Sequence, residues 1–391
     1  MRWPERPIEE IPPEEFRPPF CPCSDCPSNH SDEPARFHRN SSYVRQCDQR
    51  RVYRFVCLAC GRSCGQQTFA TTYYCKRPDL LEPVATWLNA GSAHRQIARS
   101  VGCAPSTVTR MAARLGRHAM LFQQYCLDQL EQIREPVVYD DFESFAWSQD
   151  NPFGLGTAVG SGSWFVYDLE AAPHAPSRRS ALKAVKTRAN SDDVTGKEHR
   201  QKGSYIRSTT SMLDRLLPKV PEGCDFELIT DGHPAYPIAV AEHPLSDRIR
   251  HRIFPNPKRG PKGSPPTAET VARDQAMAPV DRLHSLLRHS HAHHHRETIA
   301  FGRRVNALME RAFLYAVWRN FLKSISENRP GETPAMRVGL AEQLWSWKRV
   351  LAQRLFAWRF SLSESWLRLY KRELITSAAV YNVPHTLVNA F

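Results

Sequence analysis

The chain has 391 residues, which is too long for one small core and suggests two to four domains. Its 53 lysines and arginines exceed its 40 acidic residues, giving a net charge of +13 that favours a polyanionic partner, most simply nucleic acid. The first residues are polar and proline-rich, and no apolar run reaches about 18 residues. We therefore expect neither a signal peptide nor a membrane span, and a cytoplasmic location.

Residues 1–19 contain several prolines and alternating charges, so we expect a disordered leader. Residues 20–76 follow as a cysteine-rich module, because eight of the eleven cysteines lie between Cys21 and Cys75. A disulfide framework is unusual in a reducing compartment, so the clustering indicates metal ligation.

Two cysteine pairs in this module have the spacing of a zinc ribbon. They lie about thirty residues apart, with strand-like segments at 42–45 and 51–56 between them, and comprise Cys21, Cys26, Cys57 and Cys60. Four thiolates on tight turns give Zn²⁺ a tetrahedral shell. Cys23 could replace Cys21 or Cys26, and a redox role is the alternative to structural zinc.

Residues 78–134 have the periodicity of a helix-turn-helix domain. We expect helices at 80–90, at 93–101 with Ser92 as cap, and at 107–115 with Ser106 as cap. Apolar residues at spacings of three and four form the core, which leaves a polar face for DNA: Arg95, Arg99, Thr107, Thr109, Arg110 and Arg114. The alternative is a helical hairpin with a solvated basic face.

Residues 136–256 alternate strand-like runs with loops, and two runs end in aspartate. We expect strands at 136–141, 154–159, 164–168, 226–230 and 249–254, interrupted by a basic insertion near 173–208. Asp140 and Asp141 end the first strand on opposite faces, and Asp231 ends the fourth. Buried strand-end carboxylates require a cation, which predicts a divalent-metal site for phosphoryl transfer.

A basic, extended linker at 254–263 precedes a largely helical region that begins near Pro279. Five histidines lie between 289 and 295, but on a helix only i, i+4 pairs share a face, so we expect a polar surface and no single metal site. The tryptophans of this region are expected in the core. Its arginines, among them Arg311, Arg319 and Arg354, are expected to contact phosphate.

The order of zinc ribbon, helix-turn-helix and strand-end acids resembles bacterial insertion-sequence transposases with a ribonuclease-H-like core. Asp140-Asp-Phe-Glu-Ser-Phe145 and Thr230-Asp-Gly-His-Pro-Ala-Tyr236 are similar to the surroundings of that family's first two catalytic acids. The resemblance covers roughly residues 20–360 and selects Asp140 over Asp141.

The resemblance also implies the third acid. The family has a glutamate-arginine pair on a helix, and this chain has Asp281-Arg282, followed by Arg288 and by Glu297-Thr-Ile-Ala-Phe301. Asp281 is one methylene shorter than the family's glutamate. Glu297 and Glu310 are the alternatives for the third acid.

The resemblance implies an α/β fold: a mixed-sheet catalytic core at 136–325 and a helical C-terminal region at 326–391. It implies a DNA transposase that binds element ends, cleaves a strand at each and joins the ends to target DNA. Asp140, Asp231 and Asp281 would hold Mg²⁺ or Mn²⁺ in a nucleoid-associated homodimer or larger synaptic assembly. The alternatives are a catalytically decayed DNA-binding regulator and a metal-dependent nuclease that does not join.

Overall fold

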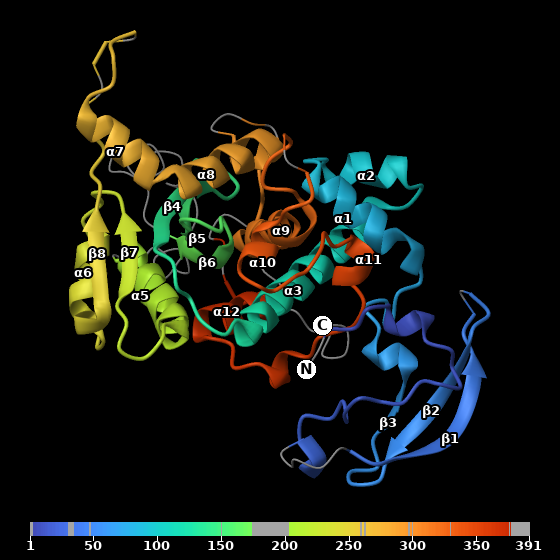
Figure 1. Cartoon of the computed structure of the whole chain (residues 1–391). Helices are drawn as coiled ribbons and strands as arrows, with labels where there is room; N and C mark the ends of the chain where they lie inside the picture. Colours follow the sequence, from blue (N-terminus) through green and yellow to red (C-terminus); the bar gives the residue numbers. More distant parts are fainter. Residues whose placement is uncertain are drawn as a thin grey trace, which may run out of the picture.

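Two β-sheets with helices packed around them make up the protein (Figure 1). The computed structural model describes residues 3–29, 35–46, 48–149, 151–173, 203–258, 260–261, 263–295, 298, 300–328, 330–374 and 376. The strands are β1 (Phe37–Val44), β2 (Arg51–Cys57), β3 (Ser63–Gly65), β4 (Val137–Phe145), β5 (Pro152–Gly160), β6 (Val166–Pro173), β7 (Phe226–Thr230) and β8 (Ile249–Ile253). The helices are α1 (Leu81–Asn89), α2 (His94–Ser100), α3 (Pro105–Gln129), α5 (Ser204–Leu216), α6 (Ala235–Glu242), α7 (Ala268–Ala276), α8 (Ala278–Ser290), α9 (Val305–Val317), α10 (Pro334–Arg337), α11 (Trp347–Val350) and α12 (Glu364–Tyr370).

The larger sheet is mixed and has the strand order β6-β5-β4-β7-β8. Strands β4, β5 and β6 pair antiparallel, whereas β7 runs parallel to β4 and β8 runs parallel to β7. Each of the five strands overlaps a segment expected from the sequence, and the mixed α/β class is confirmed. The expectation that Asp140 and Asp141 end the first strand is wrong, because β4 continues to Phe145 while paired with β5. The central strand β4 therefore has a partner on each side.

The two faces of β4 meet different helices, because successive side chains of a strand point to opposite faces. On one face the Tyr139 hydroxyl donates to Ser208 of α5. On the other, Phe142 contacts the ring of His284 on α8. Helix α8 crosses this second face above β4 and β5 (Figure 1).

The smaller sheet, β1-β2-β3, lies apart from the mixed sheet and carries the cysteine-rich module (Figure 1). The expectation that residues 1–19 are disordered is wrong for residues 3–19. Trp3 is buried against Phe122 and Trp345, while Ile8 and Phe16 pack into the core of the small sheet. Because these large apolar side chains are widely spaced among prolines and charged residues, the composition of the segment does not indicate that they are buried.

Helix α3 is longer than expected, since it continues beyond residue 115 to Gln129 and packs along α9. The two backbones approach closely at Gly116, where a Cβ would collide with Glu310. The expected serine caps are also incorrect. Ala93 and Ala104 occupy the N-cap positions of α2 and α3, the Gln96 side chain accepts from the Ala93 N–H, and Pro105 opens α3.

The region after residue 326 packs onto the mixed sheet. Trp366 of α12 is fully buried, and its indole N–H donates to the carbonyl of Leu169 on β6. Arg215 of α5 packs against the face of this ring and pairs with both Asp168 and Glu170 of β6. Its Nη2 lies 3.0 Å from Asp168 Oδ2. Arg215 is thus the buried cation that joins α5, β6 and α12.

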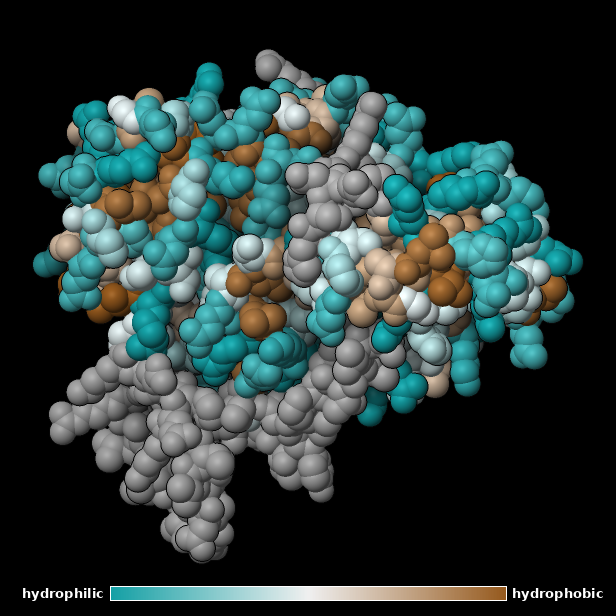
Figure 2. Space-filling view, turned by 90° about the horizontal axis from the view of Figure 1, so that it is seen from below, coloured by the Kyte–Doolittle hydropathy of each residue, from teal (hydrophilic) through white to brown (hydrophobic). Residues whose placement is uncertain are grey.

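The surface seen from below is mostly hydrophilic, and the apolar patches on it are separate from one another (Figure 2). Among the described residues, no helix is both long and apolar enough to cross a membrane. The segment 174–202, which contains most of the expected basic insertion, lies outside the described residues.

Replacing Arg215 with methionine should destabilise the fold by about 3–5 kcal/mol, because two buried carboxylates would lose their cation. Urea unfolding would measure the loss. Arg252→Met is the matched control: its ion pair with Glu227 is exposed and should be worth less than about 1 kcal/mol. Equal effects of the two substitutions would contradict this role for Arg215.

Candidate functional site

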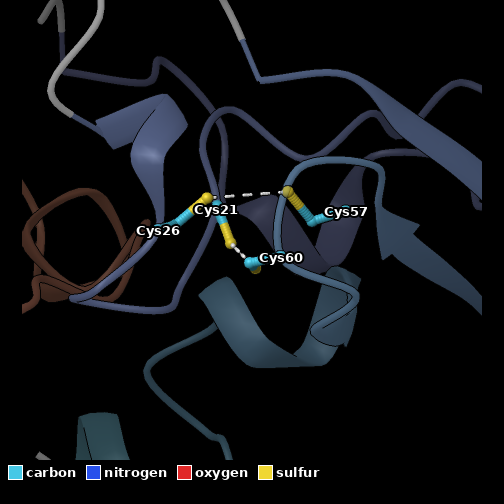
Figure 3. Close-up of side chains that lie close together, drawn as sticks. All are labelled: Cys21, Cys26, Cys57 and Cys60. Carbon is cyan, nitrogen blue, oxygen red and sulfur yellow. Dashed lines mark hydrogen bonds between the residues drawn. The ribbon is translucent and has the colours of Figure 1, made fainter.

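Four cysteines converge (Figure 3): Cys21 and Cys26 lie in the segment before β1, Cys57 ends β2, and Cys60 lies in the turn that follows. Cys21 Sγ lies 3.5 Å from Cys60 Sγ, and Cys26 Sγ lies 3.7 Å from Cys57 Sγ. A tetrahedral Zn²⁺ with Zn–S bonds of about 2.3 Å places its sulfurs about 3.8 Å apart. The cluster could therefore hold zinc, and it contains Cys21 and Cys26, with Cys23 outside it.

The environment of these thiols also suits a metal. Burial raises the pKa of Cys21, which disfavours a free thiolate there. Burial opposes ionisation of Cys26 too, but the Ser28 N–H and neighbouring thiols lower its pKa to about 7. Four thiols within ligand distance of one another can be stabilised as thiolates by a divalent cation.

The helix pair α2–α3 exposes a basic face. The expected core positions Ile97, Ala98, Val108 and Leu115 are buried. Of the residues expected to meet DNA, Arg95, Arg99, Thr109 and Arg110 are exposed and Thr107 is half-buried. Arg114 differs: its guanidinium donates to the carbonyls of Thr71 and Tyr73, at 2.8 and 2.7 Å, so it joins the helix pair to the cysteine-rich module.

The acidic residues Asp140 and Asp231 come from neighbouring parallel strands. Tyr139 of β4 pairs in register with Thr230 of β7, so the two aspartates follow at equivalent positions. The Asp231 carboxylate accepts from the His233 N–H at 2.8 Å and from Asn256 Nδ2 at 3.1 Å. The parallel register thus places both carboxylates at the same level along the neighbouring strands β4 and β7.

Asp140 lies in an environment that disfavours its charge. Burial raises its pKa to about 7, and repulsion from Asp231 and Asp281 adds to the shift. The Tyr236 hydroxyl, which donates to Asp140 Oδ1 at 3.1 Å, offsets part of it. Electrostatic coupling therefore links all three predicted acids.

Asp281 lies in the first turn of α8 and is paired with Arg273 of α7. Arg273 Nη2 is 3.3 Å from Asp281 Oδ1, and Asp140 also contributes to raising the pKa of Arg273. The Arg273 guanidinium thus supplies positive charge to Asp281 and, at longer range, to Asp140. Two groups of described residues have all their metal-ligand atoms within 4.8 Å of one another, one of cysteines and one of histidines. Asp140, Asp231 and Asp281 do not form such a group.

Sequence reasoning missed His284, which is one turn after Asp281 on α8. Its Nδ1 lies 3.7 Å from Asp140 Oδ2, and its Nε2 lies 2.8 Å from the Thr157 hydroxyl. Burial, together with Arg288 and Arg273, lowers its pKa to about 3, so the imidazole is neutral at pH 7. The sequence did contain a signal for His284: on a helix, residues three apart share a face, so Asp281 and His284 can approach the same site.

The alternatives for the third acid differ in placement. Glu297 lies outside the described residues. Glu310 is buried on α9, where its carboxylate lies 2.8 Å from Arg372 Nε and 3.8 Å from Arg117 Nη1. These ion pairs hold the Glu310 side chain in the packing between α3 and α9.

Comparisons with protein-family models, with curated proteins and with solved structures each gave no match.

The cysteine cluster predicts which substitutions remove zinc. Cys21→Ser and Cys26→Ser should each lose one equivalent of zinc, because serine is a poor zinc ligand. Cys23→Ser is the matched control and should keep it. Metal analysis of the purified chains would measure this, and zinc loss in Cys23→Ser alone would reverse the ligand assignment.

Proposed function

We propose that this protein is a metal-dependent DNA transposase with a ribonuclease-H-like core. The observation that carries the proposal is the placement of Asp140 and Asp231 at equivalent positions of neighbouring parallel strands, with Asp281 close enough to raise the pKa of Asp140. The mixed sheet centred on β4 supports the core that the sequence resemblance implies. The cysteine-rich module and the exposed face of α2–α3 precede this core along the chain.

Mg²⁺ or Mn²⁺ fits the acidic group on two observations. Desolvation, with added repulsion from Asp231 and Asp281, raises the pKa of Asp140, and Asp141 Oδ1 is buried without a hydrogen-bond partner among the described residues. Asp140, Asp231 and Asp281 would hold the ion, which would activate a water or a 3′-hydroxyl and stabilise the leaving oxygen. Hard cations prefer such oxygen ligands.

The surrounding side chains position these acids. Tyr236 donates to Asp140 and lies 3.2 Å from Asp141 Oδ2, which holds both carboxylates near the middle of β4. Neutral His284, held by Thr157, approaches Asp140 without neutralising it. Arg273 holds Asp281, and cation binding would release Asp281 from this pair.

The exposed arginines of α2 and α3 would bind the phosphate backbone of the element ends. Cutting two ends together requires at least a dimer in this proposal. Target DNA would reach the acidic group after the ends are cleaved.

Substitution of the DNA-contacting arginines should weaken binding. Arg99→Ala and Arg110→Ala should each lower affinity for duplex DNA and reduce the slope of log affinity against log salt by about 1, because each removes one phosphate contact. Fluorescence anisotropy across a salt series would measure both. Arg134→Ala, an exposed arginine outside the helix pair, is the charge-matched control; the same slope change there would argue against a specific interface.

Substituting the acidic residues should abolish strand transfer without weakening DNA binding. Asp140→Asn and Asp231→Asn should reduce strand transfer by at least about 100-fold while DNA affinity stays within a few fold, because the acids would hold the metal and not the DNA. The assay uses pre-cleaved ends, chosen from inverted repeats flanking the coding region, with Mg²⁺ and a plasmid target. Asp247→Asn, at an exposed position, is the control.

The same assay distinguishes the alternatives. Joined products support transposition, cutting alone supports a nuclease, and binding without either supports a regulator. The third acid is tested separately: Asp281→Asn should abolish joining and Glu297→Gln should not, and the reverse result would refute Asp281.

A further inference from the structure

Three of the histidines between residues 289 and 295 gather in the interior. Helix α8 ends at Ser290, and a 3-10 turn at Ala292–His294 follows. This turn brings together ring nitrogens of His291, His293 and His294, all within 4.8 Å of one another. Because the segment has left the helix, the i, i+4 rule does not apply, and the expectation of a polar surface is wrong for these three.

These imidazoles are buried and their hydrogen bonds are incomplete. His291 has no exposed surface, His294 is 2% exposed and His293 is 6% exposed. Among the described residues, Nε2 of His293 and Nε2 of His294 are buried without a hydrogen-bond partner, whereas His291 interacts with the backbone of Leu88. Buried polar atoms without partners cost free energy unless a ligand satisfies them.

A cation also lies near the rings. Burial and the positive charge of Arg311 lower the pKa of all three imidazoles. Arg311 itself donates from Nη2 to the carbonyls of Leu88 and Ser92, at 2.7 and 3.0 Å.

A second group of contacts orients the cluster. His294 Nδ1 lies 2.8 Å from the hydroxyl of Ser144 on β4, and its ring meets Phe142 edge-on. Ligand imidazoles in proteins use their other nitrogen in this way, to fix the tautomer and the ring orientation. The free Nε2 of His294 is consequently the nitrogen directed to a ligand.

We propose that His291, His293 and His294 form a second transition-metal site, distinct from the cysteine cluster, that binds Zn²⁺ through three imidazoles. Imidazole nitrogens suit zinc and related first-row ions, whereas Mg²⁺ prefers oxygen. A tetrahedral shell separates its nitrogens by about 3.3 Å, so small ring rotations close the site and leave the fourth position to water. His293 also lines a cavity of about 750 Å³.

The site lies where three parts of the chain meet. At Gly91, in the turn between α1 and α2, a Cβ would collide with the carbonyl of Ser290, directly before the cluster. Ser144 belongs to the same face of β4 as Asp140. An ion here would fix the α1–α2 turn, the end of α8 and the strand that carries Asp140 relative to one another.

The test is the metal content of the untagged full-length chain, measured for all first-row transition metals. We expect two equivalents in the natural sequence, about one in His293→Gln and in His291→Gln, and two in the matched control His295→Gln, whose side chain is exposed in the same segment. One equivalent in the natural sequence, unchanged by His293→Gln, would overturn the proposal.

A second measurement avoids variants that fail to fold. Zinc X-ray absorption of the unaltered protein should show sulfur and imidazole nitrogen together, and the Cys57→Ser chain should retain a nitrogen-only zinc. A shell of sulfur alone in the unaltered protein would refute the histidine site. None of these outcomes depends on DNA cleavage or joining.

Discussion

The negative charge that gathers where β7 ends beside the middle of β4 is the constraint on which the candidate site depends. Desolvation raises the pKa of Asp140 to about 7, and Asp231 and Asp281 add repulsion. A fold keeps such a group only if other elements compensate for it. Tyr236 supplies a hydrogen bond from α6, and α7 supplies Arg273, which pairs with Asp281 at the start of α8.

The modules that precede the mixed sheet are built into it. Helix α3 begins at the exposed basic face and continues into the core, where it packs along α9. Trp3 closes the other side of this helix by packing on Phe122. One continuous helix therefore takes part in both regions.

Much of the strand arrangement could be predicted from the sequence, because each strand is a short apolar run bounded by turn residues, as in Phe226–Thr230 before Asp231. The cysteine cluster could be predicted because paired cysteines at fixed spacing have few other uses. The histidine cluster could not, since its geometry depends on where α8 ends, and helix ends are set by tertiary contacts.

The arginines were also beyond sequence reasoning. Arg319 and Arg354 were expected to contact phosphate, yet both are buried and donate to backbone carbonyls, Ser324 and Thr68 respectively. Composition reports how many cations a chain has but not which of them satisfy its own backbone. The number of lysines and arginines in the sequence therefore overstates how many of them can contact a polyanion.

The central claim is that the carboxylates beside β4 and β7 hold a divalent cation. Crystals of the protein grown with Mn²⁺, and measured for anomalous scattering, test it most directly. We predict a manganese peak within bonding distance of Asp140 and Asp231, with Asp281 released from Arg273. Full occupancy of the Arg273–Asp281 pair, with no peak at these carboxylates, would contradict it.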